Sequence, residues 1–356
     1  MVIRSLLSNR LSHAVIGILA LASACVVTPA FAGAGLVTTE VTPVSTNVTY
    51  RDNTNGLVTY IGYTVTITND PANTNTINNV RFTATASATD SAEKPTFLSA
   101  DGATCAATNA DQTSISCTIG QLHAGQAYPT FAVFFRAPAK ITNGVADGDG
   151  QDAVAFSGIT YYAEGTGGLQ SPPQNSTGAW TASSNVILGT TNPTLVRSVV
   201  PKNSNVLIFT GNAAVTTSGN PFATSVKVPP TPSYTTADIA LSAVADPNCT
   251  NFTTCYLSQI SIPGTFSPYL TIVLRMDAAN IKKGAHIESV VIYYDGVPVG
   301  DCASPTTPFS GTAAGTPCIA KRVYYKTKSV PGWTVELDGD FEWQILNLKN
   351  GGYKVL

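Results

Sequence analysis

A strict two-residue alternation of apolar and hydroxyl side chains is the feature that most constrains this chain. Residues 63–68 read Tyr-Thr-Val-Thr-Ile-Thr, so Tyr63, Val65 and Ile67 share one face and three threonines share the other. Side chains alternate between faces along an extended strand, whereas those of a helix repeat every 3.6 residues. Turn-forming residues follow in the segment 69–71. The pattern therefore predicts a β-strand with one buried face.

Similar apolar or alternating runs recur along the chain, separated by Asn, Asp, Gly and Pro. In the first half they cover residues 80–86, 131–136, 153–156, 159–162 and 186–188. In the second half they cover residues 206–209, 238–241, 270–276, 290–294 and 341–345. Short strands at this spacing, without helical periodicity, are typical of a β-sandwich.

Three segments of the second half carry more specific expectations. Residues 290–294 are apolar on both faces, which predicts a central strand, and residues 276–283 are the one place where a helical turn is expected. The alternation of residues 341–345 slips at Leu346 and Leu348, where both neighbours of Asn347 are apolar. Either a bulge or burial of both faces would explain this slip.

The first 32 residues have the three parts of an export signal. Arg4 and Arg10 give a basic start, residues 14–22 form an apolar run of about nine residues, and Ala30-Phe31-Ala32 supplies the small residues at which signal peptidase cleaves. The run is well short of the ~20 residues that span a bilayer. We expect cleavage after Ala32. Lipoprotein processing at Cys25 is an alternative, although Ala22 stands three residues before it, where leucine is preferred.

Cleavage would leave a mature chain without a transmembrane segment, exported to the periplasm, the cell surface or the medium. Its length suggests about two domains, residues 33–190 and 200–356, with turn formers and prolines in the boundary region 189–202. Charged residues make up only 11% of the chain, and acidic residues exceed basic ones. Nucleic acid is therefore excluded as a partner, because phosphate binding needs clustered Lys and Arg.

The mature chain has six cysteines, an even number in a protein predicted to reach an oxidising compartment. They fall into three close couples, which predicts the disulfides Cys105–Cys117, Cys249–Cys255 and Cys302–Cys318. Each bond would brace a loop or a hairpin rather than join the two domains. Structural zinc is disfavoured, because the chain has no CxxC pair and the mature part has only His123 and His286 as histidines.

Residues 35–140 resemble the bacterial surface repeat called domain of unknown function eleven, an immunoglobulin-like β-sandwich. The resemblance is carried by Tyr63 to Asn69, by Asn79-Val80, by Cys105 and Cys117, and by the turn from Ile119 to Gly125 with a final apolar strand at 131–135. The family's D-x-L-P segment is missing, and the unit continues to about residue 188. The resemblance implies a structural or adhesive module of an exported bacterial protein, without catalytic residues. The second half resembles no family known to us.

Catalytic residue types are scarce, so no enzyme is predicted. His123 lies in a turn and His286 precedes a strand, and no G-x-S-x-G motif supports a Ser-His-Asp arrangement. Paired carboxylates of a glycosidase could come from Glu336, Asp338, Asp340 and Glu342. Residues 337–341 are better interpreted as a hairpin turn, because Asp-Gly favours the positive φ that such turns need.

Two weak binding sites can be named. Asp147, Asp149 and Asp152, with glycines between them, resemble the first half of a calcium loop, although position 12 is Gly158 and not the required Glu. A solvated acidic loop is the alternative. Trp333 follows Pro331-Gly332 and is the ring most expected to be exposed, so it is a candidate platform for a glycan, whereas one ring of each pair 161–162, 293–294 and 324–325 should face inward.

The sequence as a whole predicts an all-β protein of two immunoglobulin-like or related β-sandwich domains. Its expected role is that of a non-catalytic secreted or cell-surface structural or interaction protein, with a surface protein or a glycan as the partner and no cofactor. A secreted carbohydrate- or calcium-binding module is the alternative. Because the chain has few charges to blunt its edge strands, self-assembly is a further possibility.

Overall fold

The computed structural model describes residues 37–45, 47–49, 58–71, 76–88, 94–138, 141–142, 145–146, 152–164, 175–181, 186–189, 194–210, 218–219, 221–304, 316–325 and 339–356. The predicted signal peptide, with Cys25, lies outside these residues. Export and cleavage therefore stay predictions. None of the helical segments in the described part of the chain is long and apolar enough to cross a bilayer.

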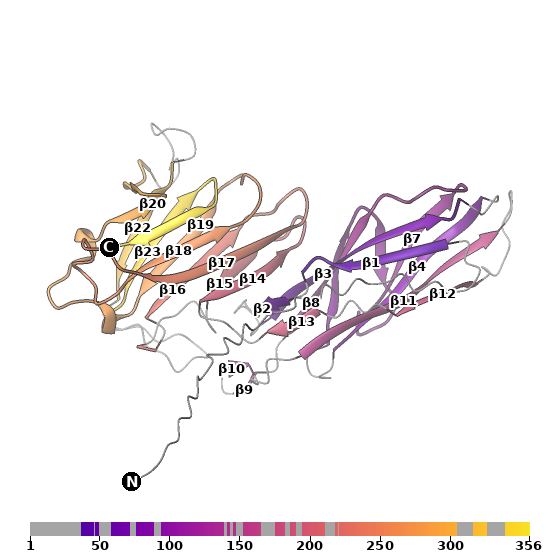
Figure 1. Ribbon diagram of the computed structural model, residues 1–356, viewed down its shortest axis with the longest axis horizontal. Helices are drawn as coiled ribbons and strands as arrows, with labels where there is room; N and C mark the ends of the chain where they lie inside the picture. Colours follow the sequence, from indigo (N-terminus) through magenta and orange to yellow (C-terminus); the bar gives the residue numbers. More distant parts are fainter. Residues whose placement is uncertain are drawn as a thin grey trace, which may run out of the picture.

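The protein is an all-β fold of two sandwiches, as predicted (Figure 1). One sheet of the first sandwich has the order β1 (Val37–Pro43), β3 (Val58–Asn69), β8 (Phe131–Pro138), β5 (Thr96–Asp101). The other has the order β2 (Asn47–Thr49), β13 (Val186–Gly189), β11 (Asp152–Glu164), β4 (Ile77–Ala88), β7 (Ser114–Leu122), β6 (Thr104–Ala107), with β12 (Asn175–Thr181) also paired to β11. All pairings in these sheets are antiparallel except that of β13 with β2. A small hairpin of β9 (Ile141–Thr142) and β10 (Val145–Ala146) stands apart.

The first core is built by the alternation seen in the sequence. Tyr63, Val65 and Ile67 on β3 are fully buried, and the Tyr63 ring stacks on Phe156 of the opposite sheet at 4.3 Å between centroids. Burial raises the pKa of the Tyr63 phenol, whose hydroxyl donates to the carbonyl of Val154. Hydrophobic burial of large rings is therefore achieved without leaving this hydroxyl unpaired.

Residues 153–156 and 159–162, which the sequence shows as two runs, lie on the single strand β11. Gly158 joins them and pairs with Ala84 on the neighbouring strand β4. A Cβ at Gly158 would lie 2.7 Å from the Cα of Ala84, and closer still to the carbonyl oxygen of Thr83. Only glycine fits this close approach of two strands.

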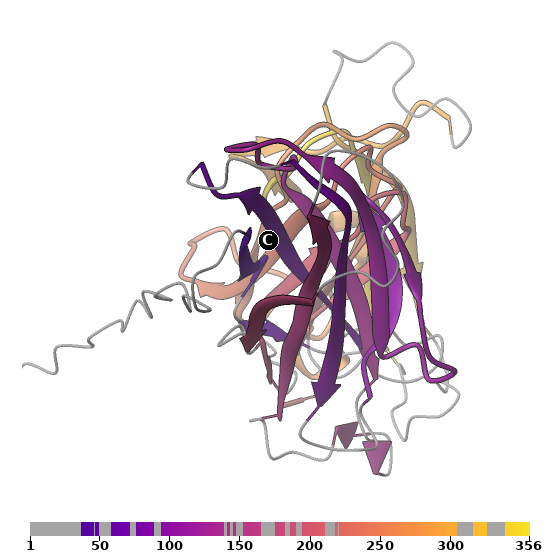
Figure 2. The same ribbon diagram turned by 90° about the vertical axis from the view of Figure 1, so that its right-hand side faces the viewer.

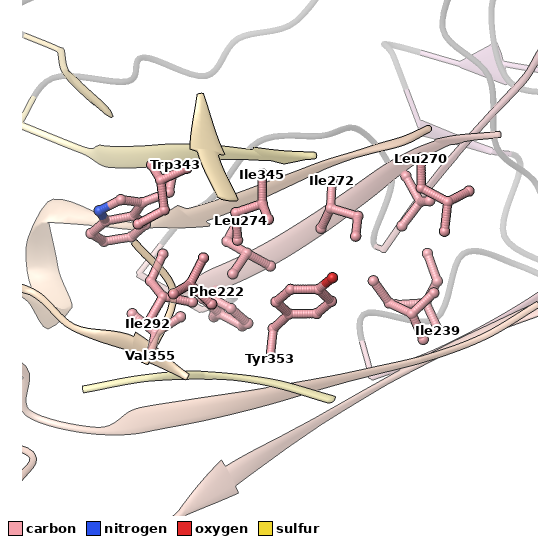
Figure 3. Close-up of a cluster of buried hydrophobic side chains, with 14 of the residues drawn as sticks. Phe222, Ile239, Leu270, Ile272, Leu274, Ile292, Trp343, Ile345, Tyr353 and Val355 are labelled. Carbon is pink, nitrogen blue, oxygen red and sulfur yellow. The ribbon is translucent and has the colours of Figure 1, made fainter. Parts of the chain in front are cut away.

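The second sandwich also consists of two antiparallel sheets. One has the order β14 (Leu195–Val200), β17 (Thr235–Val244), β18 (Cys255–Ser261), β24 (Gly351–Val355), β20 (Ile292–Tyr294), β21 (Val297–Pro298). The other has the order β15 (Val206–Phe209), β16 (Phe222–Val228), β19 (Leu270–Met276), β23 (Phe341–Asn347), β22 (Cys318–Tyr324). Figure 3 shows the core between them, where Trp343 and its sheet neighbours face Ile292, Tyr353 and Val355.

The slip in the alternation after Ile345 comes from burial on both faces at the end of β23. Leu346 is 4% exposed, and Asn347 is fully buried, where its amide donates to the Tyr353 hydroxyl. A register shift does occur opposite this position, but it lies on the partner strand β22, between Ile319 and Lys321. The pairing of β23 with β19 is regular, so burial of both faces, and not a bulge in β23, explains the slip.

The predicted central strand at residues 290–294 is wrong. The strand β20 spans only Ile292–Tyr294 and is next to the sheet edge, with the two-residue β21 outside it. Val291 is 40% exposed, so the apolar run does not require burial on both faces. The helical turn expected in residues 276–283 is present as the 3₁₀ turn η2 (Ala278–Asn280), which Asp277 caps through the backbone amide of Ala279.

All three disulfides predicted from sequence proximity are present: Cys105–Cys117, Cys249–Cys255 and Cys302–Cys318. The first joins the paired strands β6 and β7, and the other two stay within the second sandwich. They brace local loops, and the contact between the sandwiches is made without them.

The boundary between the sandwiches differs from the expected one. The strand β14 lies within the predicted boundary region 189–202 and pairs with β17, so the second sandwich begins at Leu195 rather than at residue 200. Valines at 196 and 200 pack in the second core, whereas Val199 packs in the first. One strand thus contributes side chains to both cores.

The two sandwiches lie end to end along the long axis of the molecule (Figures 1 and 2). Phe134 of β8 is fully buried, with the Tyr234 ring of the second sandwich 5.4 Å away. A Cβ at Gly62 would lie 2.8 Å from this Phe134 ring, so the glycine makes room for it. Lys202 donates to Asp101 across the junction at 2.8 Å. We call Phe134, Val199 and Tyr234, with the Lys202–Asp101 pair, the junction.

Candidate functional site

A depression of about 540 Å³ lies in the second sandwich, at the end of its sheet where Met276 pairs with Phe341. It is formed by η2, by the 3₁₀ turn η3 (Ile287–Ser289) and by the ends of β22 and β23 that lie beside them. We call it the end pocket. Its lining consists of Ala278, Ile281, Ala285, His286, Ile287, Glu288, Tyr324, Gly339 and Phe341. The volume lies within the range of small-molecule sites in proteins.

Tyr324, the last residue of β22, gives the end pocket an exposed phenol ring, and the residue is 53% exposed. It lies edge to face with the buried Phe341, at 5.8 Å and 79°. Phe341 in turn lies perpendicular to Trp343, and Trp343 perpendicular to Phe252 in the core. This series of edge-to-face contacts holds the exposed ring on rigid strands.

The polar rim of the end pocket is supplied by His286 and Glu288. The turn η3 that carries them is held in place by Ser289, whose amide and hydroxyl both donate to the carbonyl of His286, at 2.9 and 2.7 Å. The backbone of this rim is therefore fixed. An imidazole can donate and accept, whereas a carboxylate only accepts.

The carboxylates considered for a glycosidase have structural partners where they are described. Asp340 is 1% exposed and accepts from the amide of Ala278 at 3.0 Å. Glu342 forms an ion pair with Arg275 and accepts from the Tyr325 hydroxyl at 2.9 Å. Burial, and then the charge of Glu342, raise the pKa of the Tyr325 phenol. Glu336 and Asp338 lie outside the described residues.

The two histidines of the mature chain are in different sandwiches. His123 is exposed in the turn after β7, where its Nδ1 lies 3.1 Å from the Thr76 hydroxyl and its amide donates to Gln126. The two glycines of this segment, Gly120 and Gly125, have φ of 95° and 71°. Gly125 lies in a tight turn, as expected, whereas Gly120 lies within β7, where a register shift adjoins its pairing with Val80. The structure therefore does not bring His123 and His286 into one site.

The calcium candidates are placed only in part. Asp147 and Asp149 lie outside the described residues, and Asp152 is the first residue of β11. Because β11 continues through Gly158, the segment does not form the second half of an EF-hand loop. The described residues contain no group of three His, Cys, Asp or Glu side chains placed to hold a metal ion. A calcium loop at 147–152 stays a prediction.

The glycan platform predicted at Trp333 also lies outside the described residues and stays a prediction. In the sequence it falls between Tyr324 and Gly339, both of which line the end pocket. Tyr162 faces inward, as expected for one ring of its pair. The pair Tyr324-Tyr325 indicated that one of its two rings would face outward, but the sequence did not show which one.

Comparisons with known proteins give no family for this chain. No family model matches it, and no curated protein is similar to it. Among solved structures, the sporulation control protein Spo0M from Bacillus subtilis is 8% identical, with a TM-score of 0.21 over 64% of this chain and 80% of that one. An inactive mutant of a GH20 exo-β-N-acetylglucosaminidase from Vibrio harveyi is 12% identical, with a TM-score of 0.18 over 47% of this chain and 21% of that one. Both similarities are too slight to bear on the fold or function of this protein.

Proposed function

We propose that this is an exported, non-catalytic structural or interaction protein whose two sandwiches act as one elongated body. The observation that carries the proposal is the junction, where β14 supplies side chains to both cores. Two domains joined by a flexible linker would instead bury their cores separately. A fixed end-to-end arrangement suits a protein that spaces or presents surfaces.

The edge strands of the second sandwich are protected against pairing with strands of other chains. The edge strands β14 and β15 lie on the side of the first sandwich, and Val199 and Phe209 on them pack in its core. The opposite edges are the two-residue β21 and the bulged β22, which carries Lys321 and Arg322. Short, bulged, charged or covered edges oppose unselective strand pairing. Self-assembly would then use a surface other than these four edges.

Export is supported by the three disulfides, which persist in oxidising compartments. Fractionation of bacteria that produce the full chain should find the mature protein outside the cytoplasm, beginning at residue 33, without free thiols. A chain that lacks residues 1–32 should stay in the cytoplasm. An uncleaved full-length protein in the cytoplasmic fraction would contradict the proposal.

The fixed arrangement can be tested by small-angle X-ray scattering of the mature protein. One elongated particle whose scattering curve fits a single conformation is expected, and a curve that requires an ensemble of domain orientations would oppose the proposal.

A screen of glycosidase and esterase substrates tests the absence of catalysis. Turnover lost on a single Asp or Glu substitution would overturn it.

A carbohydrate-binding module is the second candidate function, and the end pocket is the observation that favours it. An exposed, rigidly held ring beside polar side chains is suited to a small ligand with both an apolar face and hydroxyl groups. Calcium binding at Asp147 and Asp149 is tested separately by calorimetry. No heat and no change in melting temperature would remove that possibility.

A further inference from the structure

We propose that the end pocket binds the ring of one neutral sugar, stacked on Tyr324 and hydrogen-bonded by Glu288 and His286. The inference rests on the second candidate function, the carbohydrate-binding module, and names its site and the charge class of its ligand. It is independent of the proposal that the two sandwiches form one structural body.

Tyr324 supplies the stacking surface. Tyr324 is 53% exposed, and its ring is supported by the edge-to-face contact with Phe341, which in turn packs on Trp343. The C–H groups on one side of a sugar ring carry partial positive charge, which the negative face of an aromatic ring attracts. A ring that is fixed before binding loses little conformational entropy when a ligand stacks on it.

Glu288 and His286 supply the hydrogen bonds. Neither side chain has a hydrogen bond or an ion pair among the described residues, whereas the nearby Asp340 and Glu342 are both engaged. A sugar hydroxyl donates and accepts at once, so it can pair with an acceptor-only carboxylate and with an imidazole of either tautomer. The rim therefore matches neighbouring hydroxyl groups better than a purely donating or purely accepting ligand.

The charges around the pocket favour a neutral ligand. Lys282 and Lys283 do not line the pocket but follow the lining residue Ile281 in the chain, and the Lys282 ammonium donates to the carbonyl of Cys249; their positive charge beside the pocket disfavours a cation. Glu288 faces the pocket itself and disfavours an anion at the hydroxyl-binding rim. An uncharged ring with several hydroxyl groups is repelled neither by the lysines nor by Glu288.

The apolar floor leaves room for the less polar side of the ring. Ile281, Ile287 and Phe341 contribute aliphatic and aromatic atoms, and Ala278 and Ala285 keep the centre open. Gly339, at φ 83°, passes so close to Ala278 that a Cβ there would lie 2.9 Å from the alanine Cβ. Any side chain at position 339 would therefore disturb the wall of the pocket.

The test is an amide-resonance NMR titration of the mature protein with the methyl glycosides of glucose, galactose, mannose and N-acetylglucosamine. Each is added to about 50 mM, because a single ring in an open pocket is expected to bind with a dissociation constant near 1 mM. We expect at least one glycoside to shift the resonances of Ala285, Ile287 and Phe341. Choline and glucuronate serve as the cationic and anionic probes, and neither should bind more tightly.

Three variants separate stacking from hydrogen bonding. Tyr324→Ala should weaken binding roughly tenfold, and Tyr324→Trp should retain it, since a larger ring still stacks. Glu288→Gln should change the affinity less than about threefold, because the amide keeps an acceptor. Tyr161→Ala, on the outer face of the first sandwich, is the matched control and should leave binding unchanged. Unaltered melting temperatures would show that each variant is folded.

The proposal is overturned if no neutral glycoside shifts the pocket resonances, or if Tyr324→Ala binds as the parent does. It is also overturned if choline binds more tightly than every glycoside and Glu288→Gln abolishes that binding, because the pocket would then be a cation site. None of these results alters the scattering curve that tests the structural role, so the two proposals can fail separately.

Discussion

At the scale of single residues, close backbone approach makes some glycines indispensable. At Gly158 the neighbouring strand leaves no space for a Cβ beside Ala84. We expect Gly158→Ala to lower the free energy of unfolding by about 3 kcal/mol, because β11 or β4 must move to relieve the overlap. Urea unfolding of the variant would measure the loss.

Gly300→Ala is the matched control, since nothing lies within 4 Å of a Cβ at that position. It should change the free energy of unfolding by less than about 0.5 kcal/mol. Equal effects of the two substitutions would show that the strands β4 and β11 do not approach each other as closely as described.

Asp246 makes the stability of the second sandwich depend on pH. A hydrogen bond from Lys354 at 2.7 Å, and then one from the amide of Asn248, hold the pKa of this carboxyl below its usual value. Because the folded-state pKa is lowered, the carboxylate stabilises the fold fully above about pH 4. This contribution to the stability is lost as the pH falls through the pKa that the carboxyl has in the folded state.

Asp246→Asn should therefore be less stable than the parent at pH 7, and the difference should narrow towards pH 2. Urea unfolding at both values measures it. Glu40→Gln, at an exposed position on β1, is the control and should show no such trend. A difference for Asp246→Asn that stays constant with pH would mean that the ion pair does not act through this ionisation.

At the scale of elements, the disulfides act inside hairpins and loops. Replacing Cys105 and Cys117 by Ala should lower the free energy of unfolding by about 2 to 3 kcal/mol, if the disulfide acts by restricting the unfolded chain. The strand β6 should stay paired with β7 in the folded variant. The same replacement at Cys249 and Cys255 should cost somewhat less, since that loop is shorter. Chemical unfolding of both variants compares the two losses, and a larger loss for the shorter loop would contradict the entropic account.

Several elements could be predicted because their signal is local. The alternation around Tyr63 and around Trp343 correctly gave strands and their buried faces. The cysteine couples gave the disulfides, because short separation restricts the possible pairings. The strand β20 was predicted wrongly, because an apolar run does not record where in a sheet it lies. Its place near the edge depends on β24, about 60 residues away in the chain.

At the scale of the whole molecule, the junction should make the two sandwiches unfold together. Tyr234→Ala removes the ring that packs on Phe134 and should uncouple them. Differential scanning calorimetry should show one transition for the parent and two for the variant. Tyr128→Ala is the control, because Tyr128 packs on Phe131 within the first sandwich and not at the junction. Two transitions in the parent would show that the junction does not couple the sandwiches.

The sequence by itself determined the fold class, the buried faces of the long strands, the turn at Gly125 and the cysteine pairs. Each of these is recorded in local periodicity or in short separations along the chain, which for the disulfide partners are 6 to 16 residues. Only the tertiary structure decided that β14 serves both cores, that Gly62 admits the Phe134 ring, and that Tyr324 and Glu288 line one pocket. Those contacts join segments far apart in the chain, and no local pattern encodes which distant surfaces will meet.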